Sequence, residues 1–90
     1  MKRMQYKISG RVQGVGFRYF TRDEARKLPI SGWVRNEPDG SVLVECQGEA
    51  EVLQEFEKRL QKGPPSSRVL SVVGHELSPQ ENEHGFEIRH

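Results

Sequence analysis

The sequence predicts an α+β fold of the ferredoxin-like class, a βαββαβ sandwich with a short additional strand at its end. Two observations carry this prediction. Segments in which apolar and polar residues alternate are typical of strands, and two segments with apolar residues at helical spacing lie between them. In this arrangement we expect two helices on one face of an antiparallel sheet. Because 90 residues can bury one modest core, we expect a single domain over residues 1–90.

The first strand and the first helix are predicted from two different periodicities. Tyr6 and Ile8 alternate with charged or small residues as far as Val12, which is the two-residue period of a half-buried strand. Over residues 17–28 the apolar side chains recur at helical spacing. Pro29 then predicts the end of the helix, because proline disfavours helical backbone in the residue before it.

A hairpin is expected after the first helix. Residues 30–36 are predicted as its first strand and residues 41–47 as its second, with Cys46 on the same face as two valines. Between them, Glu37-Pro38-Asp39-Gly40 is typical of a tight turn, with proline favoured at the second position and glycine at the fourth.

The second half of the chain predicts one more helix and two more strands. Residues 50–62 carry an apolar stripe that includes Phe56, and Gly63-Pro64 supplies a helix stop. The valine-rich residues 69–75 are predicted as a fourth strand, and residues 86–88 as a short closing strand.

This order of elements brings two segments to one edge of the sheet. Because crossover connections are right-handed, we expect the first two strands to run parallel, with the third antiparallel between them. The glycine-rich segment after the first strand and Asn36 at the end of the second then meet at the same edge. Two inter-strand gaps separate them, or roughly 10 Å.

The glycine-rich segment Gly10–Arg18 has the features of an anion-binding loop. Glycine allows a sharp turn and a close approach of the backbone to a ligand. Backbone N–H groups at the start of the following helix, aided by the helix dipole, bind anions, and the guanidinium of Arg18 can hold two phosphate oxygens at once. We therefore predict a phosphoryl-binding loop with the Asn36 carboxamide facing it.

Other interpretations of the two glycines are a dinucleotide-binding fingerprint, a P-loop or a turn without a ligand. The fingerprint needs a small residue where Tyr19 stands, and the P-loop needs a Lys-Ser/Thr pair that the segment lacks. A plain glycine turn remains the alternative to a phosphoryl-binding loop.

Two motifs resemble the signatures of the acylphosphatase family. Gly10–Arg18 is similar to the first signature. Gly32-Trp33-Val34-Arg35-Asn36, followed by Asp39-Gly40-Ser41-Val42, is similar to the second. Gly63-Pro64 and Phe86-Glu87-Ile88 also stand where the family has such residues, so the resemblance covers nearly the whole chain.

The resemblance implies hydrolysis of the carboxyl–phosphate bond of an acyl phosphate. This reaction on an acid anhydride yields a carboxylate and inorganic phosphate, without a metal or another cofactor. By position, Arg18 is similar to the family's phosphate-binding arginine, and Asn36 to the asparagine that orients the attacking water. The loop from Gln13 to Arg18 is similar to the one whose backbone amides hold the phosphate, so the resemblance implies a phosphate-binding loop of Gln13, Gly14, Val15, Gly16, Phe17 and Arg18. Pro29-Ile30 departs from the family pattern, in which many members have glycine before an aliphatic residue, and this concerns the backbone at a helix end.

The histidines and the cysteine favour structural roles. His75, His84 and His90 have no metal-ligand spacing, so we expect them at the surface or at strand ends. Cys46 alternates with apolar residues, which predicts a buried thiol rather than a nucleophile.

Three aromatic residues could line a pocket for the acyl group. These are Tyr19, Phe20 and Trp33, although packing is the favoured interpretation for all three. Arg35 is expected on the opposite face of its strand from Asn36, at the surface.

Composition excludes several classes of partner. With 14 basic and 13 acidic residues, no overall field attracts nucleic acid or a membrane surface. RNA-recognition modules share the predicted fold, but residues 42–46 lack their aromatic motif. No apolar segment approaches a membrane span, and a single cysteine suits a reducing compartment. We expect a cytoplasmic monomer whose partners are an acyl phosphate substrate and inorganic phosphate.

Two alternatives keep the same fold. One is a relative of the acylphosphatase-like domains that begin larger carbamoyl-phosphate-using maturation proteins, which the absence of a following second domain disfavours. The other is an inactive sensor of an anionic metabolite, which a turnover assay distinguishes from an enzyme.

Overall fold

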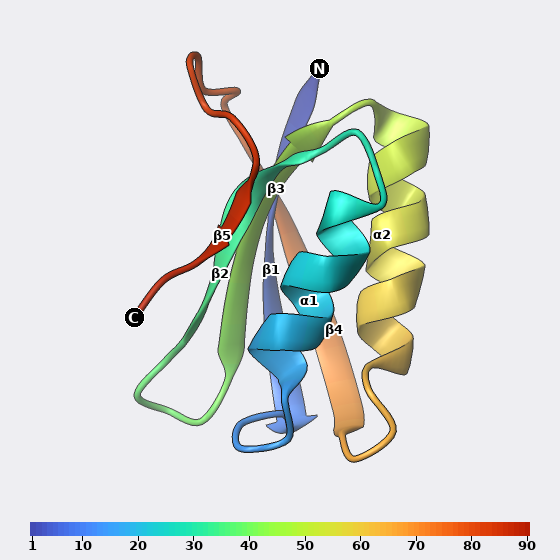
Figure 1. Ribbon diagram of the computed structural model, residues 1–90, viewed down its shortest axis with the longest axis vertical. Helices are drawn as coiled ribbons and strands as arrows, with labels where there is room; N and C mark the ends of the chain where they lie inside the picture. Colours follow the sequence, from blue (N-terminus) through green and yellow to red (C-terminus); the bar gives the residue numbers. More distant parts are fainter.

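The predicted order of elements is confirmed in the computed structural model, which describes residues 1–90 (Figure 1). The elements are β1 (Lys2–Arg11), α1 (Phe17–Arg26), β2 (Ser31–Asn36), β3 (Val42–Gly48), α2 (Ala50–Lys62), β4 (Arg68–Leu77) and β5 (Phe86–Ile88). Both helices pack on one face of the sheet, and the glycine-rich loop and the β2–β3 turn lie at the same end of the molecule (Figure 1). The fold is therefore the ferredoxin-like sandwich that the periodicities predict.

The strand order across the sheet is β4-β1-β3-β2-β5. As predicted, β3 lies between β1 and β2 and is antiparallel to both. One detail differs from the predicted antiparallel sheet, because β5 pairs with β2 in parallel. The direction of β4 explains this. β4 is antiparallel to β1, so it ends at the end of the sheet where β1 begins. A chain that crosses the sheet at this end and then forms a strand must run in the direction of β1 and β2.

The core lies between the sheet and the two helices. Helix α1 contributes Phe17 and Ala25 to it, and α2 contributes Leu53, Phe56 and Leu60. These are the apolar stripes that the helical spacing predicts, so the helix faces are confirmed.

Cys46 lies in this core, fully buried on β3, which confirms the prediction of a buried thiol. Burial raises the pKa of Cys46 to about 12, because the low-dielectric surroundings disfavour the thiolate.

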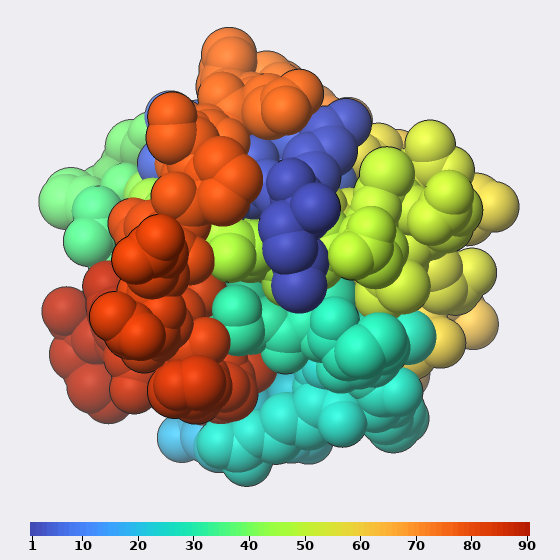
Figure 2. All heavy atoms as spheres, turned by 90° about the horizontal axis from the view of Figure 1, so that it is seen from above, coloured from blue at the N-terminus to red at the C-terminus, as the bar shows by residue number.

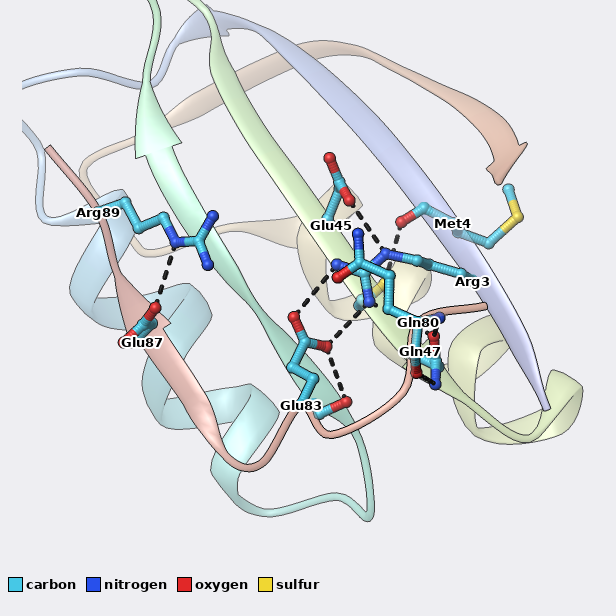
Figure 3. Close-up of polar contacts among 10 residues, drawn as sticks. Arg3, Met4, Glu45, Gln47, Gln80, Glu83, Glu87 and Arg89 are labelled. Atoms are coloured by element: carbon cyan, nitrogen blue, oxygen red, sulfur yellow. Dashed lines mark hydrogen bonds and ion pairs between the residues drawn. The ribbon is translucent and has the colours of Figure 1, made fainter. Parts of the chain in front are cut away.

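A buried arginine holds the segment that crosses from β4 to β5. The Arg3 side chain is completely buried, and its Nε donates to Glu45 Oε1 at 3.0 Å. Its two terminal nitrogens donate to the two carboxylate oxygens of Glu83, at 2.9 and 3.2 Å (Figure 3). Ser31 Oγ adds a further hydrogen bond to Glu83, at 2.9 Å. The crossing segment therefore lies against the start of β1, at the end of the molecule shown in Figure 2.

β1 begins at Lys2, earlier than predicted, and Met4 continues the alternation of Tyr6 and Ile8 toward the core. Arg3 lies on the opposite face of the strand, where two carboxylates neutralise its charge.

The ionisation of Glu83 links this cluster to pH. Burial alone would raise the pKa of Glu83, but the hydrogen bonds from Arg3 and Ser31 and the charge of Arg3 outweigh it and hold the pKa below its usual value. A carboxyl whose pKa is lower in the folded state stabilises the fold above its unfolded pKa, and this stabilisation is lost as the pH falls through the folded pKa.

We expect Glu83→Gln to lower the free energy of unfolding at pH 7 by about 1–3 kcal/mol, the scale of losing hydrogen bonds to a charged group. Urea unfolding measures this. The difference from wild type should begin to shrink once the pH falls below the unfolded-state pKa of about 4.3, and it is lost only as the pH falls through the lower folded-state pKa of Glu83. Glu81→Gln is the matched control, because Glu81 is exposed in the same segment. Equal effects of the two changes at pH 7 would contradict the role of Glu83.

Candidate functional site

The loop between β1 and α1 turns through two glycines. Gly14 and Gly16 have φ angles of +73° and +77°, in the left-handed region that costs other residues roughly 1–2 kcal/mol. A Cβ atom at either position would meet no atom within 4 Å, so backbone conformation rather than crowding requires glycine here. Gly16 is also the residue that precedes the first turn of α1, and it offers no side-chain cap to the helix amides.

The backbone amides of this loop are free to bind a ligand. No N–H group of residues 13–19 donates a hydrogen bond within the chain, and the first helical bond runs from Phe20 N to Gly16 O at 3.0 Å. Free amides at a helix start bind anions, because the partial positive charge of the helix dipole adds to their donor capacity. The loop and the start of α1 thus form one continuous set of donors.

These amides border a small hollow of about 140 Å³. The residues that line it are Val12, Gly14, Gly16, Phe17, Arg18, Tyr19 and Asn36. The structure therefore brings together the two predicted halves of the site, the glycine loop with Arg18 and the end of β2. Val12 and Tyr19 are additional lining residues.

The hollow has one cation and no carboxylate. Arg18 makes no ion pair, and its nearest polar partner is His90, whose Nδ1 lies 3.4 Å from Arg18 Nη1. The carboxylate of Glu37 follows Asn36 in sequence, yet it accepts a hydrogen bond from Arg35 Nε at 3.1 Å instead. The positive charge of Arg18 is consequently available to an anion in the hollow.

Asn36 reaches the hollow because of strand register. It pairs with Val42 of β3, and Val42 in turn pairs with Ile8 of β1, so Asn36 lies level with Ile8 across two strands. The β1–α1 loop folds back to this level, which places the start of α1 next to Asn36. The Asn36 carboxamide makes no hydrogen bond within the chain, so both its donor and its acceptor are available.

Gln13 connects the two halves of the site. Its Nε2 donates to the backbone oxygens of Glu37 and Ser41, at 2.8 and 2.9 Å. Glu37 is the first residue of the predicted turn and Ser41 follows its last, and the hydrogen bond from Gly40 N to Glu37 O at 3.1 Å confirms this turn. The Gln13 side chain thus points to the β2–β3 turn and not into the hollow. Val15, the other predicted loop residue that does not line the hollow, packs against the core.

The three aromatic candidates have different environments. Trp33 is buried, with the guanidinium carbons of Arg35 and Arg89 at 5.0 and 4.9 Å from its ring centre. Phe20 packs at 6.0 Å from the ring of Phe17. The packing interpretation is confirmed for both residues, and it is wrong for Tyr19, which is 57% exposed at the hollow.

The predicted positions of Arg35 and of the three histidines are confirmed. Arg35 stacks on Trp33, which lies two residues before it and hence on the same strand face, opposite to Asn36. His75, His84 and His90 are exposed. No three His, Cys, Asp or Glu side chains lie together in an arrangement that could hold a metal ion.

The sequence and the structure both match known proteins. A model of the acylphosphatase family matches residues 4–88. The chain belongs to the acylphosphatase family. Membership of this family identifies it as a hydrolase of the acylphosphatase type.

Relatives from several bacteria match nearly the whole chain. The acylphosphatase of Salinibacter ruber is 44% identical over 88 residues, covering 98% of this chain and 93% of its own length. The acylphosphatase of Oceanobacillus iheyensis is 43% identical over 91 residues, and this match covers the full length of both chains. The crystal structure of the acylphosphatase from Bacillus subtilis is 39% identical, with a TM-score of 0.95 over the full length of both chains.

None of the helices is both long enough and apolar enough to span a membrane.

Gln13→Glu tests the connection between the loop and the turn. The change replaces a donor by a carboxylate oxygen that faces two carbonyl oxygens, so we expect the free energy of unfolding to fall by about 1–3 kcal/mol. Urea unfolding at pH 7 provides the measurement. Gln54→Glu makes the same chemical change on the exposed face of α2, and equal stability of the two variants would refute the bridging role of Gln13.

Proposed function

We propose that this acylphosphatase cleaves the carboxyl–phosphate bond of acyl phosphates in the hollow between the glycine loop and β2. Water attacks phosphorus, the bond from phosphorus to the carboxyl oxygen breaks, and the products are a carboxylate and inorganic phosphate. One observation carries the proposal: free amides, an arginine that makes no ion pair and a free carboxamide line one hollow without a carboxylate.

The loop amides and Arg18 bind the phosphoryl group in this mechanism. In-line transfer at phosphorus depends mainly on positioning and on stabilising the charge of the equatorial oxygens. Preorganised amides and a bidentate guanidinium supply that stabilisation, and the absence of a nearby carboxylate avoids repulsion of the substrate. The glycines keep the amides in place, because their left-handed backbone is not readily adopted by other residues.

Asn36 positions the attacking water. Its amide group has both a donor and an acceptor, so it can orient a water molecule toward phosphorus. Because an asparagine amide is a very weak base, we propose that the proton of the water passes to a phosphoryl oxygen of the substrate. The leaving carboxylate is stable as an anion, so the reaction needs no strong general acid, and the hollow contains none.

Arg18→Lys should reduce kcat/KM for benzoyl phosphate by roughly 30- to 1000-fold, which corresponds to about 2–4 kcal/mol of transition-state stabilisation. A lysine retains the charge but loses the two-pronged geometry. Arg68→Lys is the matched control on the exposed part of β4. We expect wild-type turnover to be unchanged by EDTA. An unaffected Arg18→Lys variant, together with weak inhibition by phosphate, would contradict phosphoryl binding at this site.

Asn36→Ala should lower kcat for benzoyl phosphate by about 100-fold, because the attacking water loses its positioning group. Inhibition by inorganic phosphate should persist, since Arg18 and the amides remain. Asn36→Asp should weaken phosphate inhibition as well, because a carboxylate then faces the anion. Near-full turnover of Asn36→Ala would refute the water-positioning role, and phosphate binding without turnover in the wild type would indicate an anion sensor instead.

A further inference from the structure

Most of the acyl group must lie outside the hollow, if the proposed function holds. The hollow is small, at about 140 Å³. A phosphoryl group and the attacking water occupy most of that space. The rest of the substrate therefore extends past the mouth, where side chains on the surface decide which acyl groups bind well.

Tyr19 is the one large exposed side chain at this mouth. Four large hydrophobic residues are exposed in the chain, namely Met1, Tyr19, Leu70 and Val73. Of these, only Tyr19 lines the hollow. It is the third residue of α1, and side chains of a helix lean toward its N-terminus, which here is the phosphoryl-binding end.

Neighbouring residues hold the Tyr19 ring and leave it accessible. The guanidinium carbon of Arg22, one turn further along α1, lies 5.3 Å from the ring centre. Arg22 Nε also donates to Asp23 at 3.2 Å, which balances its charge. The stacked arginine orients the ring before a substrate binds, so binding costs little side-chain conformational entropy. The Tyr19 side chain nevertheless remains accessible, because 57% of the residue is exposed.

The other aromatic residues near the site cannot take this role. Phe20 is packed against Phe17, and Trp33 is covered by two arginines. Tyr19 thus provides the aromatic surface on which a planar acyl group could stack.

We propose that Tyr19 determines acyl-group specificity by forming a stacking platform that favours aromatic acyl phosphates over small aliphatic ones. This proposal rests on the proposed function, because the acyl group reaches Tyr19 only when its phosphoryl group is bound by Arg18 and the loop amides.

The test compares kcat/KM for benzoyl phosphate and acetyl phosphate in wild type, Tyr19→Ala and Tyr19→Phe. We expect Tyr19→Ala to lower the benzoyl-to-acetyl ratio about three- to tenfold, the range of an aromatic pair, mainly through KM for benzoyl phosphate. Tyr19→Phe should keep the ratio, because its ring stacks equally well. Leu70→Ala, which removes an exposed side chain on β4, is the matched control and should also keep it.

The possible outcomes separate this proposal from the function on which it rests. A ratio that is unchanged in Tyr19→Ala, with both substrates still hydrolysed by the wild type, overturns the platform and leaves the hydrolase intact. Hydrolysis of neither substrate by the wild type overturns both. A lower ratio in Tyr19→Ala with unchanged inhibition by inorganic phosphate supports the platform, since a general structural defect would weaken phosphate binding too.

Discussion

The pairing of β3 with β1 on one side and β2 on the other is the constraint on which the site depends. Because both pairings are antiparallel, β1 and β2 run in the same direction and their carboxyl ends reach one edge of the sheet. Asn36 and the glycine loop can meet only under this condition. The register then sets the level at which they meet, and Gln13 joins the loop to the turn that begins where β2 ends.

Charge is distributed unequally between the two ends of the sheet. At the end where β1 begins, Arg3 is buried between two carboxylates, which neutralise it and hold the crossing segment in place. At the opposite end, Arg18 has no carboxylate partner, although it belongs to a chain with nearly equal numbers of basic and acidic residues. The first arrangement contributes to stability, whereas the second leaves a cation able to bind an anion. Two arginines of one chain thus serve different purposes because their neighbours differ.

Much of the fold and the backbone part of the site could be predicted from the sequence, because periodicity and turn chemistry are local. The helix stripes, the turn before Ser41 and the juxtaposition of the glycine loop with Asn36 all follow from such signals. The direction of β5 depends on a long-range crossing, and the orientation of the Gln13 side chain depends on two distant carbonyl oxygens. Tyr19 falls outside the apolar stripe of α1, which is a local sign of exposure. The general preference of aromatic side chains for packing outweighed this sign in the prediction.

The route of the chain after β5 has a practical consequence. The last strand leads back toward the glycine-loop end, and His90 lies beside the guanidinium of Arg18. The first residue lies at the far end of the molecule, as Figure 1 shows. A purification tag, a fluorophore or a surface tether attached after His90 would therefore start beside Arg18 and the hollow that it lines, whereas one attached before Met1 would leave the hollow open to the solvent.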